Sequence, residues 1–281
     1  MTEEKIKKIV ECMPVSELTR PIQLIQTKHR VKLVEFWDVK VGSKILEIGC
    51  GQGDTTAVLA YYAGEEGYVH GIDIASPTYG SPVNLGDSAK YLLQSKLGKQ
   101  IRIDFNVDLL SPEFELEDAS FDYIVFSHCS WYTRSREELL NILSKVRKWG
   151  KQLCFAEWST TFNSIEQFPH LLSILIQAQY EAFKRESQSN IRTLLTPEDI
   201  KEITELAGWK IIRDEMIESP DLQDGRWEVD IVLSGFDNEL RDIENLPDKM
   251  KDLLRSQISI LKSSIVHKDI QPLPIYCFVA Q

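Results

Sequence analysis

No stretch of the sequence approaches the ~20 uninterrupted apolar residues that a membrane-spanning helix needs. The first residues are charged, and no apolar signal region follows them. We therefore predict a cytoplasmic protein that does not associate with membranes. The chain has 281 residues, of which 43% are hydrophobic and 27% charged, so it suits one large domain, or one domain with a helical cap.

Cysteine and histidine are scarce and scattered. The chain has five of each, and neither a C-x-x-C nor an H-x-x-x-H spacing occurs. A disulfide framework needs paired cysteines, and a structural zinc site needs clustered ligands. The sequence therefore predicts neither of these, and no catalytic metal held by the protein.

Positive charge is the minority charge. Lysine and arginine total 32 against 43 aspartates and glutamates, for a formal net charge of −11. Phosphate backbones attract clustered cations, but the densest basic stretches here, 5–8 and 145–148, are short and typical of solvated helix faces. We therefore predict no nucleic-acid partner.

The apolar pattern changes once, near residue 40. Residues 1–38 have helical spacing and form a predicted N-terminal helical cap. Short apolar runs typical of buried parallel strands then alternate with helical stretches, which predicts a doubly wound α/β fold with a mostly parallel sheet. Such a sheet binds ligands beyond the carboxyl ends of its strands. The predicted strands lie at 44–48, 68–74, 101–107, 121–127 and 152–157, and the helices between them at 54–63, about 87–97 and 135–148.

Two helical insertions interrupt this alternation. In the first, about 159–195, the stretch 168–183 is apolar on more than one face. It is either a lid over the pocket, which we favour because it follows a strand end, or a subunit contact in a homodimer. The second, about 219–272, is mostly helical, although 228–233 alternates enough to form a strand. A helix opening at Thr196, and strands at 209–213 and 275–279, complete the pattern.

A glycine-rich loop joins the first predicted strand to the first helix after it. Gly49, Gly51 and Gly53 let the backbone turn sharply and lie against a ligand. In the dinucleotide fingerprint G-x-G-x-x-G a pyrophosphate faces the helix start, but here Asp54 occupies the third glycine position and would repel it. With Glu47 before the loop, this acidic rim suits a ligand with ammonium and sulfonium charges, such as S-adenosylmethionine (SAM).

Two aspartates follow the next strands. Asp73 ends the second strand, about twenty residues past the loop, where a carboxylate can accept hydrogen bonds from both ribose hydroxyls. Asp108 lies near the end of the third strand and is placed to accept from an adenine amino group. Asp73 is alternatively a solvent-exposed acid at a strand end, and the signal at Asp108 is weaker because Asp104 and Asn106 are close by.

Together these residues resemble the class I SAM-dependent methyltransferases. The resemblance rests on E-x-G-x-G-x-G at 47–53, Asp73, the aspartate near 108 and Phe121-Asp122, and it covers roughly 40–158 and 208–209. It implies a SAM-binding domain over 39–281 with a seven-stranded sheet whose last strand is reversed. It also implies that Glu47 and the loop lie near the methionine part of SAM, with Asp73 on the ribose.

The methyl acceptor is expected beyond the fourth and fifth strands. Positioning and desolvation supply much of the rate of methyl transfer, and a base is needed only if the acceptor loses a proton. His128 is a candidate base, or else a packed histidine, and Glu157 is a second base or an acid that orients an amine. The other candidate acceptor contacts are Trp131 and Tyr132, which follow the fourth strand, and His29, Tyr180 and Arg192 in the cap segments.

We therefore predict a methyltransferase that uses SAM on a small-molecule acceptor. A SAM-binding protein without catalysis, or a methyltransferase acting on a protein, is the alternative of a different kind. A nicotinamide-dependent oxidoreductase is a further alternative that Asp54 disfavours.

Overall fold

A seven-stranded sheet forms the centre of the computed structural model, which describes residues 3–185, 187, 189–266 and 269–281. Its strand order is β3-β2-β1-β4-β5-β7-β6, and β7 alone runs antiparallel to its neighbours. The predicted doubly wound sheet with a reversed last strand is therefore confirmed. The strands are β1 (Lys44–Ile48), β2 (Tyr68–Ile72), β3 (Ile101–Asp104), β4 (Phe121–Ser127), β5 (Gly150–Trp158), β6 (Ile211–Ile217) and β7 (Ile275–Ala280).

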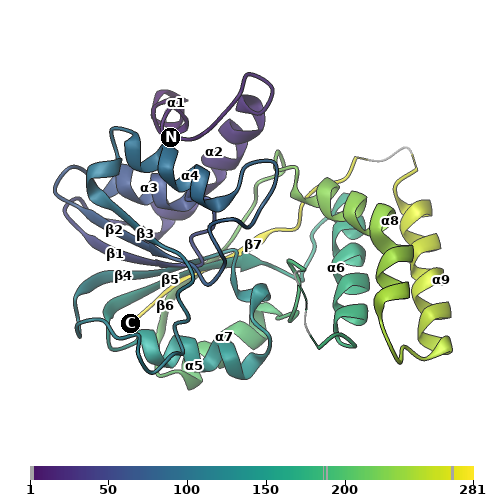
Figure 1. The fold of residues 1–281 in the computed structure, drawn as a ribbon. Helices are drawn as coiled ribbons and strands as arrows, with labels where there is room; N and C mark the ends of the chain where they lie inside the picture. The colour runs from purple at the N-terminus through teal and green to yellow at the C-terminus, as the bar shows by residue number, and fades with distance from the viewer. Residues whose placement is uncertain (1–2, 186, 188, 267–268) are drawn as a thin grey trace.

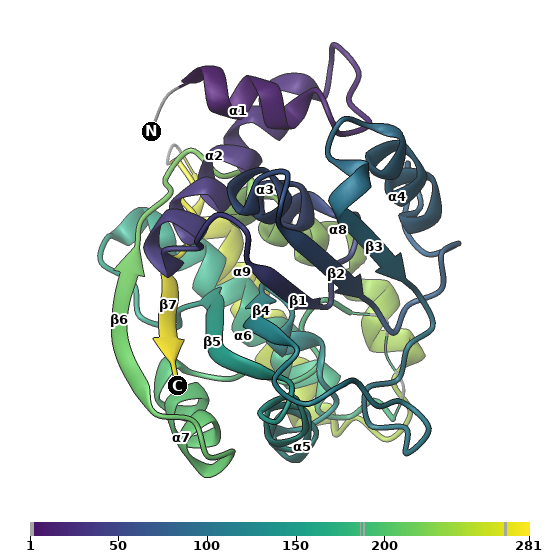
Figure 2. The same cartoon turned by 90° about the vertical axis from the view of Figure 1, so that its left-hand side faces the viewer.

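Helices cover both faces of the sheet, and a third group lies beyond the carboxyl ends of its parallel strands (Figures 1 and 2). One face packs against α1–α4 and the other against α5 and α7 (Figures 1 and 2). The central strands are buried on both sides, which explains their unbroken apolar runs. The helices are α1 (Glu3–Val10), α2 (Arg20–Trp37), α3 (Asp54–Ala63), α4 (Leu85–Gln94), α5 (Arg136–Val146), α6 (Phe168–Glu181), α7 (Pro197–Leu206), α8 (Asp224–Asp242) and α9 (Asp248–Ser264).

The third group consists of α6, α8 and α9, whose buried side chains form a separate apolar cluster. Helix α6 presents Ile176 to this cluster and Ile174 to the core below the sheet, which explains why it is apolar on more than one face. The suggestion of a strand at 228–233 is wrong, because these residues lie within α8. Val229, Val232 and Phe236 recur there at helical spacing and pack in the cluster.

The helix that opens at Thr196 shows how local chemistry sets an element. Thr196 and Asp199 bond reciprocally to each other's backbone N–H groups in a capping box, and Pro197 begins α7. Past its end, Gly208 takes a φ of +87°, a left-handed conformation that favours glycine.

The domain boundaries at 1–38, 39–281, 159–195 and 219–272, and the choice between lid and subunit contact, stay predictions. Positions 1–2, 186, 188 and 267–268 of those segments lie outside the described residues. No helix in the described ranges is both long and apolar enough to cross a membrane.

Candidate active site

A cavity of about 1000 Å³ opens beyond the carboxyl ends of β1, β2, β4 and β5. Its walls come from the glycine loop, the loops after β2, β3 and β4, and the end of β5. Helices α2, α6 and α8 close the opposite side. The cavity thus lies where parallel-sheet proteins of this topology bind ligands.

The glycine loop forms one end of this cavity. Gly49, Gly51 and Gly53 have φ values of +69°, +53° and +87°, which side chains rarely tolerate. A Cβ on Gly49 would lie 2.8 Å from Cβ of Cys129, so this glycine lets the loop approach the end of β4. Gly53 does not line the cavity; a Cβ there would meet Leu92 at 2.9 Å, so it serves helix packing.

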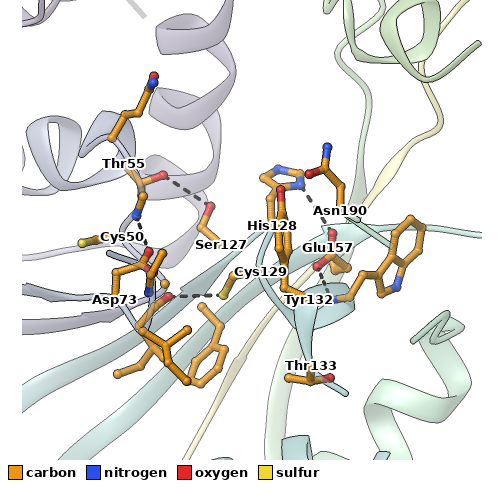
Figure 3. Close-up of a pocket in the computed structure, with 18 of the residues that line it drawn as sticks. Cys50, Thr55, Asp73, Ser127, His128, Cys129, Tyr132, Thr133, Glu157 and Asn190 are labelled. Carbon is orange, nitrogen blue, oxygen red and sulfur yellow. Dashed lines mark hydrogen bonds and ion pairs between the residues drawn. The ribbon is translucent and has the colours of Figure 1, made fainter. Parts of the chain in front are cut away.

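Asp73 holds the glycine loop and still faces the cavity. Its Oδ2 accepts from the N–H of Gly51 at 2.8 Å, and its Oδ1 accepts from the N–H of Ala75 at 2.8 Å. A carboxylate offers about four lone-pair positions, so two stay free for hydroxyl donors. Figure 3 shows Asp73 beside the loop, on the opposite side of the cavity from His128 and Glu157.

Asp108 is solvent-exposed and also lines the cavity. The strand β3 ends at Asp104, earlier than we predicted, because the chain turns through Asn106 with a φ of +58°. Asp108 therefore belongs to the loop after the strand, where its Oδ1 accepts from the N–H of Leu110 at 2.9 Å.

Glu47 lies almost wholly out of solvent at the base of the cavity. Its side chain is 2% exposed and accepts a hydrogen bond of 2.5 Å from Oγ1 of Thr56. Burial raises the pKa of Glu47 to about 8, since the charged form loses hydration. A cationic ligand group in the cavity would favour the ionised form of this carboxyl.

A chain of hydrogen bonds runs from the protein surface to the centre of the cavity. Nζ of Lys32 lies 3.3 Å from Oγ of Ser219, which lies 3.0 Å from Nδ1 of His29. Nε2 of His29 lies 2.9 Å from Nε2 of His128. Nδ1 of His128 in turn faces Oε1 of Glu157 at 3.7 Å.

The position of Glu157 favours one tautomer of His128. Nδ1 of His128 has no hydrogen-bond partner among the described residues, but it faces the carboxylate at 3.7 Å, which favours a proton on this nitrogen over a lone pair. His29 then donates from Nε2 to His128, and His128 carries its proton on Nδ1. Burial lowers the pKa of His29 well below its usual value, which keeps His29 neutral. Nε2 of His128 is then the basic nitrogen, and since it has one lone pair it can take a proton from a ligand only after His29 withdraws its hydrogen bond.

Several hydrogen bonds hold the side chain of Glu157 in place. It is 2% exposed, and its Oε2 accepts from the N–H and hydroxyl of Ser130 at 3.0 and 2.7 Å and from the N–H of Trp131 at 3.4 Å. Its Oε1 accepts from the N–H of Trp158 at 3.0 Å. These donors hold the carboxylate beside His128, so a proton gained by the imidazole would be stabilised there.

The remaining predicted acceptor contacts divide into two groups. Trp131, Tyr132 and Arg192 line the cavity, and both Arg192 and Thr193 donate backbone N–H groups to the carbonyl of Trp131. Tyr180 does not line it: this side chain is 3% exposed within the cluster of α6, α8 and α9. The sequence predicted that the helix of Tyr180 reaches the cavity, but it did not show which turn of that helix lines the cavity.

Several cavity residues were not predicted from the sequence. The guanidinium of Arg30 lies 3.6 Å from Asp54 and donates to Oε1 of Gln26, while its buried Nε has no partner among the described residues. Arg30 had little signal in the sequence, because it is one polar residue on a helix whose neighbours look ordinary. The others are Gln26, Trp158, Asn190, Asp224 and Glu228.

The residues present fit SAM better than a dinucleotide. Asp54 begins α3 and lines the cavity, so a pyrophosphate at this helix start would meet a carboxylate. Buried Glu47 suits an ammonium group and Asp73 a pair of ribose hydroxyls. In the described part of the chain, no three His, Cys, Asp or Glu side chains gather as metal ligands would.

Fold and cavity together define a class I SAM-dependent methyltransferase. The model of the ubiE/COQ5 methyltransferase family matches residues 22–213. The chain belongs to this family, which confirms the predicted resemblance and SAM as the cofactor.

Individual relatives agree with this assignment. The methyltransferase phomM' of Diaporthe leptostromiformis is 26% identical over 249 residues, covering 75% of this chain and 64% of that protein. The demethylmenaquinone methyltransferase of Bacillus cereus (strain ATCC 10987) is 28% identical over 145 residues, covering 49% of this chain and 54% of that protein. The chain thus spans less than two thirds of the length of these curated relatives.

One solved structure matches along the whole chain. The cyclopropane-fatty-acyl-phospholipid synthase-like protein of Lactobacillus casei ATCC 334 is 33% identical, covers 100% of both chains and superposes with a TM-score of 0.86. The magnesium protoporphyrin IX methyltransferase of Synechocystis PCC 6803, with bound S-adenosylhomocysteine (SAH), shares the fold at 13% identity and a TM-score of 0.52, covering 99% of this chain and 92% of its own.

Binding of SAH at pH 7 is expected to release about one proton from Glu47. With a pKa of about 8 the free carboxyl is protonated, and the ammonium of the ligand favours its ionised form. Because the ligand prefers ionised Glu47, affinity should weaken as pH falls below 8. Calorimetry in two buffers of different ionisation enthalpy measures the release. The Glu47→Gln variant should release none, and an unchanged release would place the ammonium elsewhere.

Proposed function

We propose that the protein transfers the methyl group of SAM to a small-molecule acceptor. One observation carries the proposal: a single cavity brings Glu47, Asp73 and the glycine loop together with the paired side chains of His128 and Glu157. Its volume of about 1000 Å³ lies at the upper end of the range for small-molecule pockets, which suits a nucleoside with a small partner.

In this proposal each part of the cavity has its own task. When bound, SAM supplies an activated methyl group on a positively charged sulfur. Glu47 pairs with its ammonium group, Asp73 accepts from its ribose, and Asp108 lies toward the adenine. His128 accepts a proton from the acceptor at Nε2, and Glu157 stabilises the resulting imidazolium. Trp131, Tyr132 and Arg192 bound the space for the acceptor.

We also infer that the protein works in the cytoplasm. All five cysteines are free thiols, and four of them are buried, which suits a reducing compartment. The acidic net charge supports a partner other than nucleic acid.

A ligand comparison followed by a turnover assay tests the proposal. SAM and SAH should raise the melting temperature by mass action while NAD should not, and SAH should then accumulate with some members of an acceptor panel. Stabilisation by NAD alone would favour the oxidoreductase. Tight SAM binding without turnover on any acceptor would favour a protein that binds SAM without catalysis.

A further inference from the structure

The charged side chains that line the cavity are mostly acidic. Among the described residues, eight carboxyl groups face it against three guanidinium groups and no lysine. Two of the histidines there add no charge, since burial lowers the pKa of His170 to about 3 and that of His29 well below its usual value. The cavity therefore favours cations over anions.

Most of these charges already have partners or an assigned task. Arg30 lies near Asp54, and Arg134 lies 3.8 Å from Glu138. Under the proposed function, the carboxyls of residues 47, 73 and 108 face SAM. The charged groups that remain for the acceptor are three carboxyls, of Glu157, Asp224 and Glu228, and one guanidinium, of Arg192.

Asp224 and Glu228 lie one turn apart on α8 and both face the cavity. Oδ2 of Asp224 accepts from Nε2 of Gln26 at 2.7 Å, and Oε2 of Glu228 accepts from Nε2 of Gln177 at 2.6 Å. Neither carboxyl has a cationic partner among the described residues. Each retains lone pairs for a donor that enters the cavity.

Aromatic side chains line the same cavity as these carboxyls. Tyr132 is 39% exposed and lines the cavity, as does Trp158, whose ring centroid lies 5.0 Å from that of His128. Burial raises the pKa of Tyr132, and the charges of Glu157 and Glu228 add to the rise. Carboxylates beside aromatic faces form a typical site for an organic cation.

We propose that the methyl acceptor is a primary or secondary amine that enters as its ammonium form, held by Asp224 and Glu228 beside Tyr132 and Trp158. The inference rests on the proposed function, whose acceptor it specifies. Once His29 has withdrawn its hydrogen bond from Nε2 of His128, the ammonium gives one N–H proton to this nitrogen, which frees the lone pair of the amine. That pair forms the new N–C bond as the C–S bond breaks and its electrons go to sulfur. The product is an N-methylated ammonium ion and a neutral thioether.

The reaction requires that the amine loses a proton close to where it binds. The pair of His128 and Glu157 supplies this step, since the carboxylate stabilises the imidazolium that forms. Asp224 and Glu228 then need only to attract and orient the cation, and they take no proton in the reaction.

Binding of matched probes to the SAH-loaded protein tests the inference. Each of two probe sets keeps one carbon skeleton and changes only the functional group from amine to alcohol to acid. The first set is phenethylamine, 2-phenylethanol and phenylacetate, and the second is hexylamine, hexanol and hexanoate. We expect the better amine to bind at least about tenfold tighter than its alcohol and its acid. Mass spectrometry should detect the methylated amine when SAM replaces SAH.

Variants separate recognition of the amine from general damage. The double variant Asp224→Asn, Glu228→Gln should lose about tenfold or more in amine affinity, with SAH affinity within about twofold of the wild type. The matched control Asp230→Asn removes an exposed carboxylate from the same helix and should change neither affinity.

The possible outcomes distinguish the two proposals. If SAH itself fails to bind, the proposed function is wrong. If SAH binds but the alcohols or acids bind as well as the amines, or no amine binds, the amine acceptor is wrong. An unchanged amine affinity in the double variant also overturns it.

Discussion

Replacing His128 with asparagine is expected to lower kcat by about 10²–10⁴-fold. The imidazole Nε2 is the basic atom at the centre of the cavity, and asparagine has no comparable base. Asparagine also suits the backbone, because residue 128 has a φ of +53°, a left-handed conformation that asparagine tolerates better than most residues. Steady-state kinetics with the best acceptor of the panel measures the loss.

The controls for this variant follow from the site. SAH affinity should stay within about twofold, because the contacts expected for SAM come from other residues. A tertiary amine also enters as its ammonium form and must lose its N–H proton, so its methylation should depend on His128 as much as that of a primary amine does. A kcat within about threefold of the wild type on a primary amine would show that the proton leaves by another route.

The sequence was sufficient to predict the sheet and the cofactor end of the cavity. Buried parallel strands read as unbroken apolar runs, and the strand-to-helix loop carries its glycines and acids within a few residues of one another. Glu47 and Gly49 lie two residues apart, and Asp73 follows β2, which pairs with β1, so the order of the elements brings all three to one cavity, while their roles toward SAM stay predictions.

The acceptor end depends on contacts between distant segments. Gln26 meets Asp224 across 198 positions of sequence, and His29 meets His128 across 99. No spacing rule connects such pairs, since the packing of α2 on the sheet and of α8 beyond the strand ends decides them. Tyr180 fails as a prediction for the same reason, because α6 turns that residue toward α8 and α9.

The stretch 228–233, for which a strand was the alternative to the predicted helix, shows how two periodicities can compete. The stretch alternates between apolar and polar residues, but Val229, Val232 and Phe236 also recur at helical spacing. Helices α6 and α9 offer an apolar surface to the side chains on one face of α8. The helical form therefore buries more apolar side chains than a strand would, and it is the stable form.

Replacing Glu157 with glutamine is expected to lower the free energy of unfolding by about 3 kcal/mol. Its two oxygens accept from three backbone N–H groups and one hydroxyl at 2.7 to 3.4 Å, with the side chain 2% exposed. A glutamine amide has one N–H₂ end, and either orientation sets that end against donors that need an acceptor. Urea denaturation without ligand measures the change.

The exposed carboxylate of Glu202 provides the matched control. It pairs with Arg136 at 2.8 Å on the surface, with its side chain 63% exposed, so Glu202→Gln should cost less than about 1 kcal/mol. If Glu157→Gln costs no more than this control, the carboxyl of Glu157 is neutral in the native protein. A neutral carboxyl could not stabilise the imidazolium of His128, and proton transfer to this histidine would then lack its electrostatic support.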